Sequence, residues 1–151
     1  MQTQAIIVID RPVQDVWNFL DDHGNDLVWR RPQLQKLEQV GTGPVRVGTK
    51  FEGVITAIGP KQYPYVNEIT AYEPPHRVAW KAVSSAGWVI GREGSYTLEA
   101  DSDQRTKMIF SIVMEPITFA GKLVAPLMSP MGSNLVMPLL KQLKEALEPK
   151  R

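Results

Sequence analysis

The chain contains no cysteine, which excludes disulfide bonds, thiol nucleophiles and thiolate metal sites together. Only two histidines are present, His23 and His76, so a serine nucleophile would have few bases to activate it. The charges are balanced, with 17 Lys and Arg against 16 Asp and Glu and a formal net charge of +1. This balance, without any long block of like charge, argues against nucleic acid or an anionic membrane as the main partner.

Long apolar runs are also missing. No run reaches the length that spans a bilayer, and the first ten residues lack the basic region and apolar core of a signal peptide. With 151 residues, 43% hydrophobic and 22% charged, the composition is typical of one globular domain. We therefore expect a single domain over residues 1–151, a cytoplasmic location without stable membrane insertion, and a monomer or small homo-oligomer. No metal or cofactor is expected.

Alternating apolar and polar residues predict strands along most of the chain. The first predicted strand is Ala5–Ile9, a short run rich in β-branched residues. Six more strand-like stretches follow one another between residues 33 and 116, separated by turns that contain glycine, proline or aspartate. Consecutive short strands with tight turns favour a single antiparallel sheet.

Helical spacing is found on both sides of this strand region. A short amphipathic helix is predicted from the stripe Val13, Val16, Trp17 and Leu20, with Trp17 as its buried anchor, and a second short helix is expected at residues 26–30. Residues 119–147 are helical in pattern, although prolines interrupt them, and the clearest part carries the stripe Val136, Leu140, Leu143 and Leu147. The predicted fold is α+β: a curved seven-stranded antiparallel sheet around a long C-terminal helix, with two short helices after the first strand.

Three stretches resemble a known superfamily. They are Ile9–Pro12, the segment Glu68–Trp80 (EITAYEPPHRVAW) and the closing Leu143–Glu148. Together with the order of elements, they are similar to the SRPBCC or START-like superfamily, in its bacterial polyketide cyclase/dehydrase and lipid transport branch. The resemblance implies a helix-grip fold. It also implies a cavity for a hydrophobic small molecule between the sheet and the C-terminal helix.

A group of aromatic side chains shares the inward parity of the predicted strands: Phe51, Tyr65, Trp80, Trp88, Tyr96 and Phe110. Two interpretations remain open, since these rings either fill an ordinary core or line a ligand pocket. In the second case we expect Ile55, Asn67, Arg92 and Leu139 or Leu140 to complete the ligand-binding set. An unpaired guanidinium is costly to bury, so Arg92 either reaches solvent at the mouth of the pocket or anchors an anionic group of the ligand.

His23 lies among three acidic residues, Asp21, Asp22 and Asp26, so an acid/base or metal site is conceivable there. No metal-ligand spacing accompanies this cluster. We therefore interpret His23 as part of a solvated helix end.

Two classes of function remain. The prediction is binding of a hydrophobic small molecule that is lipid-, polyketide- or aromatic-like, and the alternative is a polyketide cyclase/dehydratase-type enzyme that acts on a similar ligand in the same cavity. An inward His, Asp or Glu close to Tyr65, Asn67 or Arg92 would favour the enzyme. Strand alternation supplies none, so the sequence favours binding and assigns no catalytic residue.

Overall fold

The computed structural model describes residues 2–56, 61–85, 89–116, 119, 122–123 and 132–148. In chain order its elements are strand β1 (Gln2–Ile9), helix α1 (Val13–Asp21), the 3₁₀ turn η1 (His23–Asn25), helix α2 (Asp26–Trp29), strands β2 (Leu34–Val40), β3 (Lys50–Thr56), β4 (Gln62–Glu73), β5 (Arg77–Ser85), β6 (Val89–Ser102) and β7 (Arg105–Pro116), and helix α4 (Gly132–Leu147). The predicted α+β order of elements is confirmed.

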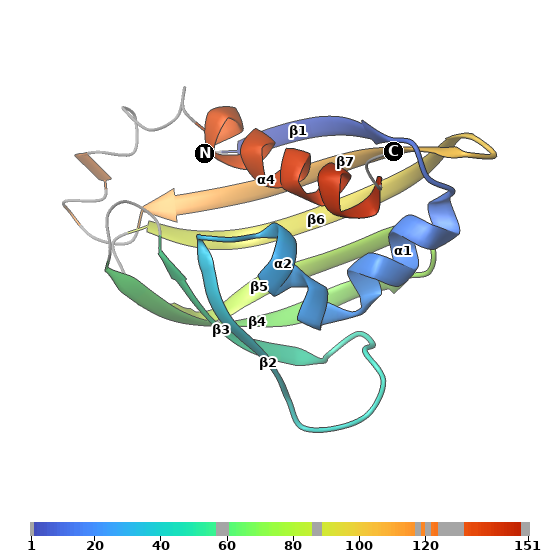
Figure 1. Ribbon diagram of the computed structural model, residues 1–151. Coiled ribbons are helices and arrows are strands. Elements are labelled where there is room, and N and C mark those ends of the chain that lie inside the picture. The colour runs from blue at the N-terminus through green and yellow to red at the C-terminus, as the bar shows by residue number, and fades with distance from the viewer. Residues whose placement is uncertain are drawn as a thin grey trace.

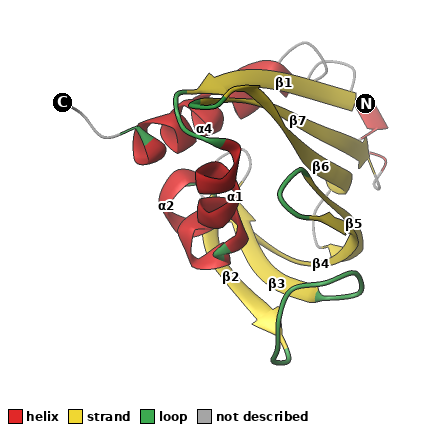
Figure 2. Ribbon diagram, turned by 90° about the vertical axis from the view of Figure 1, so that its right-hand side faces the viewer, coloured by secondary structure: helices red, strands yellow, loops and turns green. Residues whose placement is uncertain are grey.

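The strands form one antiparallel sheet in the order β1-β7-β6-β5-β4-β3-β2 (Figure 1). Strands β2 to β7 follow one another as hairpins, and β1 joins the sheet beside β7. The sheet is curved but not closed, and the helices lie on its concave side (Figure 2). Register shifts in β2, in the β4–β5 pair and in β6 contribute to this curvature, because an extra residue in one strand bends the ladder.

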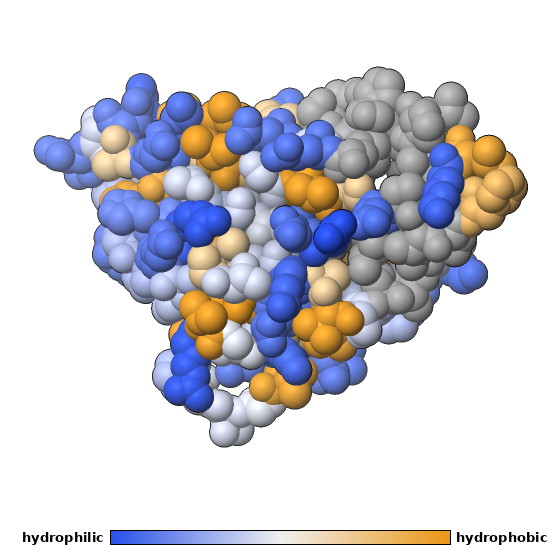
Figure 3. Space-filling view, turned by 180° about the vertical axis from the view of Figure 1, so that it is seen from behind, coloured by the Kyte–Doolittle hydropathy of each residue, from blue (hydrophilic) through white to orange (hydrophobic). Residues whose placement is uncertain are grey.

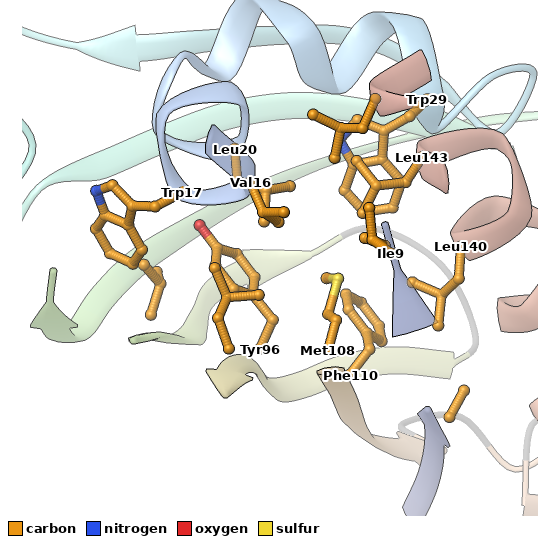
Figure 4. Packing of buried hydrophobic residues seen from close by; sticks show 14 of the residues in the cluster. Ile9, Val16, Trp17, Leu20, Trp29, Tyr96, Met108, Phe110, Leu140 and Leu143 are labelled. Carbon is orange, nitrogen blue, oxygen red and sulfur yellow. The ribbon is translucent and has the colours of Figure 1, made fainter. Parts of the chain in front are cut away.

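Helix α1 packs against β6 and β7 through the predicted stripe. Val16, Trp17 and Leu20 are at most 3% exposed, which confirms Trp17 as the buried anchor of this helix. Its indole contacts the rings of Tyr72 and Tyr96, with ring centroids 5.5 and 6.5 Å apart. Figure 4 shows these side chains converging with those of the other helices on β6 and β7.

Helix α4 packs against β1 and α2. The predicted stripe is buried at all four positions, and Leu140 and Leu143 are fully inaccessible. The earlier part of the predicted helical stretch, residues 117–131, lies mostly outside the described residues.

The end of α4 is tied to the open edge of the sheet. The Lys144 Nζ donates a hydrogen bond of 2.8 Å to the Val8 carbonyl, and the Glu148 carboxylate accepts one of 2.6 Å from the Asp10 N–H. These contacts satisfy backbone groups near the end of β1 that have no neighbouring strand.

The face seen from behind carries mixed residues, with apolar side chains scattered between polar ones (Figure 3). Among the described residues, no helix combines the length and apolar character that crossing a membrane requires.

Candidate functional site

A cavity lies between the concave face of the sheet and the η1–α2 segment. We call it the inner cavity; it is lined by His23, Asp26, Trp29, Arg30, Leu37, Phe51, Tyr65, Asn67, Ile69, Val78, Trp80, Tyr96 and Phe110. Its volume is about 50 Å³. A space of this size holds a few water molecules, since each needs roughly 10–15 Å³ by this measure.

The sheet side of the inner cavity is aromatic. The Trp80 ring packs against the rings of Tyr96 and Phe110, with centroids 6.2 and 6.0 Å apart. These rings fill much of the concave face and also line the space that remains, so both interpretations of the aromatic set stay open.

Two glycines let aromatic rings lie against the sheet. Gly94 is the cross-strand partner of Trp80, and Gly53 is the partner of Tyr65. A Cβ atom at either glycine would come within 2.4 Å of the facing ring. The rings therefore occupy the space that side chains would fill at these two positions, and this keeps the inner cavity open.

Two tyrosines, Tyr65 and Tyr96, line the inner cavity. Burial raises the pKa of the Tyr65 hydroxyl above its ordinary value, with Arg30 opposing the shift and Asp26 adding to it. Burial also raises the pKa of Tyr96, and the Asp26 carboxylate adds to that shift. Both hydroxyls are consequently protonated at neutral pH and available as hydrogen-bond donors.

The helix side of the inner cavity is polar. The His23 Nδ1 lies 3.5 Å from the Asp26 Oδ2, and the Trp29 Nε1 donates a hydrogen bond of 3.1 Å to the other oxygen, Oδ1. Asp26 is only 8% exposed. The His23 ring also has an apolar neighbour, because its centroid lies 4.3 Å from the centroid of the Phe51 ring.

The interpretation of His23 as a solvated helix end was therefore wrong. Asp26 is drawn inward by the indole N–H of Trp29, and η1 folds His23 back over Phe51. A carboxylate three residues before a tryptophan was the one available signal, and reading it required knowledge that Trp29 is buried. In the described part of the chain, no group of three or more His, Asp and Glu side chains is arranged to hold a metal ion.

Six of the predicted ligand-binding residues line the inner cavity: Phe51, Tyr65, Asn67, Trp80, Tyr96 and Phe110. Ile55 does not line it, and Trp88 lies outside the described residues. Leu140 belongs to the hydrophobic core and Leu139 packs against it, and neither lines the inner cavity, whose helix side is formed by η1 and α2. The sequence prediction missed the helix-side residues His23, Asp26, Trp29 and Arg30.

Arg92 lies apart from the inner cavity. The β6 register shifts between Gly91 and Glu93, so the regular alternation that placed Arg92 on the inward face is interrupted there. The Arg92 side chain is 61% exposed and its Nη1 lies 2.8 Å from the Glu115 Oε2. Of the two outcomes considered from the sequence, the structure has the guanidinium at the surface, where it reaches a carboxylate and solvent.

A sequence profile of one family covers almost the entire chain. The family is described as polyketide cyclase / dehydrase and lipid transport, and its profile matches residues 2–148. No curated protein matches this sequence significantly.

Solved structures give a similar result for the fold. A protein of Thermus thermophilus is 21% identical with a TM-score of 0.79, and the alignment covers 97% of both chains. The ZhuI aromatase/cyclase of a Streptomyces species is 14% identical with a TM-score of 0.77, covering 97% of this chain and 93% of that one. A norcoclaurine synthase point mutant from Thalictrum flavum, in complex with a transition-state analogue, is 14% identical with a TM-score of 0.66 and the same coverage. At these identities the likeness shows a shared helix-grip-like fold.

Proposed function

The chain belongs to the polyketide cyclase / dehydrase and lipid transport family, and from this premise we propose that it binds a hydrophobic small molecule at the inner cavity. The ligand is lipid-, polyketide- or aromatic-like. The observation that carries the proposal is the lining, in which aromatic and aliphatic side chains surround a few polar groups. This is the usual composition of a small-molecule site, where the apolar surface supplies affinity and sparse polar groups orient the ligand.

The polar groups suggest which part of the ligand is recognised. Tyr65 and Tyr96, whose hydroxyls are protonated, and Asn67 line the same space as the rings. A carbonyl or hydroxyl oxygen on the ligand would accept hydrogen bonds from these donors. The two named neighbours, an aromatase/cyclase and a norcoclaurine synthase, agree with small-molecule chemistry on this fold.

Binding is tested by titration with Nile red, followed by displacement with a panel of fatty acids and polycyclic aromatic compounds. The wild-type protein should bind the dye, and Ile69→Phe should weaken binding by about tenfold or more, since 1.4 kcal/mol corresponds to tenfold. Ile69 lines the inner cavity and is 4% exposed, so a larger ring there fills the remaining space.

The control is Arg92→Met, which should leave affinity unchanged. It removes only an exposed ion pair and should alter the free energy of unfolding by less than about 1 kcal/mol. Circular dichroism of both variants confirms that they remain folded. If wild-type protein binds neither the dye nor any panel compound, and native mass spectrometry finds no copurified molecule, the proposal is wrong.

A second function, the cyclase/dehydratase type of enzyme, is favoured by His23 and Asp26. These residues meet the condition stated from the sequence, because an imidazole and a carboxylate line the same cavity as Tyr65 and Asn67. Asp26 would orient the His23 ring, which would take a proton from the carbon next to a ligand carbonyl. The C–H electron pair would then form the enolate C=C bond, and the Tyr65 hydroxyl would hydrogen-bond the enolate oxygen.

This second function is tested by hydrogen–deuterium exchange at the central carbon of an aryl 1,3-diketone, followed by NMR. Wild-type protein should accelerate exchange, and His23→Gln should reduce the acceleration by roughly 10²–10⁴-fold, the usual contribution of a general base. Binding of the diketone should survive the substitution. Equal exchange rates with wild-type protein and His23→Gln would exclude His23 as the base and leave binding as the proposed function.

A further inference from the structure

A second hollow lies directly outside the inner cavity. We call it the outer groove; it has a volume of about 340 Å³ and is lined by Asp21, Asp22, His23, Gly24, Leu37, Gln39, Val45 and Phe51. Three side chains line both hollows: His23, Leu37 and Phe51. We call these three shared side chains the wall, and they include the contact between the His23 and Phe51 rings.

The volumes of the two hollows bear on what the site can hold. The inner cavity alone, at about 50 Å³, is far below the roughly 300–1,000 Å³ of ordinary small-molecule sites. The outer groove alone reaches that range but has few aromatic neighbours and is open to solvent. Joined together, the two hollows provide both the required volume and an apolar inner end.

The wall is held together weakly on the His23 side. The imidazole reaches Asp26 at 3.5 Å, beyond the usual 2.7–3.2 Å of a hydrogen bond between nitrogen and oxygen. Its side chain is 20% exposed and belongs to the single turn η1, whereas Phe51 is 5% exposed and belongs to β3. A change of the His23 side-chain rotamer would therefore open the wall without disturbing the sheet.

We propose that the inner cavity and the outer groove form one binding site. A ligand connects the two hollows when it displaces the His23 ring from the Phe51 ring. This inference rests on the proposed function and specifies the ligand: a flat apolar ring system that enters the inner cavity, with a hydroxyl-bearing end that remains in the outer groove. The outer groove presents the carboxylates of Asp21 and Asp22 and the amide of Gln39. A hydroxyl group can donate to these oxygens, whereas a carboxylate on the ligand would be repelled.

The proposal separates long ligands from short ones, and the probes are 1-hydroxypyrene and 2-naphthol. Val45→Trp fills the outer groove and should weaken binding of 1-hydroxypyrene by about tenfold or more, with a smaller effect on 2-naphthol. The matched control is Val47→Trp, the same substitution two residues further along. Val47 is 60% exposed and lines neither hollow, so this variant should bind both probes as wild type does.

A second variant tests the wall without filling the groove. His23→Ala removes one of its two rings, and stopped-flow fluorescence should show 1-hydroxypyrene associating at least severalfold faster than with wild type. If wild type binds 1-hydroxypyrene and Ile69→Phe blocks it, but Val45→Trp and His23→Ala both behave as wild type, the ligand reaches the inner cavity by another route. In that case this inference is wrong and the proposed function stands. If wild type binds Nile red but neither probe, this inference is wrong and the proposed function stands, whereas absence of binding of the dye, of both probes and of every panel compound would overturn both.

Discussion

Replacing Trp17 by alanine is expected to lower the free energy of unfolding by about 3–5 kcal/mol, the usual range for truncating a buried Phe or Trp. Trp17 is 3% exposed, and its indole lies against the rings of Tyr72 and Tyr96. The substitution removes apolar area from the core and leaves a space between α1 and β6 that the backbone cannot close. Aromatic contacts add to the loss, since each such pair contributes about 0.5–1.5 kcal/mol beyond its buried area.

Urea denaturation followed by far-ultraviolet circular dichroism measures this loss. Trp17→Phe keeps an aromatic ring at the position and should retain a large part of the stability. Val28→Ala on α2 serves as the control, because Val28 is 57% exposed and its truncation should change stability by no more than about 0.5 kcal/mol. A loss below about 1 kcal/mol for Trp17→Ala would mean that α1 does not anchor the fold as described.

The elements that bury one face were predictable because burial leaves a period in the sequence. The stripes of α1 and α4 and the alternation of the strands follow directly from 3.6-residue and two-residue spacing. Trp17 and Leu140 are buried for this reason, and Phe51, Tyr65 and Phe110 lie on the inner face. The burial of such residues can be predicted from the face of the helix or strand that is covered, without knowing which elements meet.

The helix side of the site has no such period. His23 and Asp26 lie in η1 and at the start of α2, where three or four residues do not define a face. Their inward position depends on the hydrogen bond between Asp26 and the Trp29 indole, which is a tertiary outcome. Arg92 illustrates the opposite failure. The alternation that placed Arg92 on the inward face was clear, but a register shift beside Gly91 interrupts it. A glycine within a strand often marks such a bulge, and Gly91 was therefore a local signal that the alternation alone did not use.

The volume of the inner cavity was likewise beyond the sequence, because it is the small remainder after many side chains have packed. Whether the five inward aromatic rings that the structure describes fill a space or line it depends on how each ring lies. Gly53 and Gly94 let Tyr65 and Trp80 lie against the sheet, and strand alternation alone does not reveal this. The size of the inner cavity therefore depends on positions such as Gly53 and Gly94, where an added methyl group would displace a ring.

Gly94→Ala is expected to move the Trp80 ring off the sheet. The new Cβ would lie 2.4 Å from Cζ2, 2.5 Å from Cε2 and 2.7 Å from Nε1 of the Trp80 indole, all far inside van der Waals contact. Trp80 packs against Tyr96 and Phe110 and lines the inner cavity, so the inner cavity offers free space into which the ring can move. The variant should lose about 1–3 kcal/mol of stability, as overpacked cores do, and should bind Nile red at least about tenfold more weakly.

A double-mutant cycle with Trp80→Phe isolates the overlap from the other effects. The phenylalanine ring is smaller than the indole and has no counterpart of the complete fused ring system that meets the new Cβ, so Gly94→Ala should cost much less in the Trp80→Phe background. The expected interaction energy is about 0.5–3 kcal/mol in the compensating direction, the range for residues in contact. Urea denaturation of the wild type, both single variants and the double variant gives this value directly. Additive losses would show that Trp80 does not lie over Gly94, and the inner cavity would then not depend on a glycine at this position.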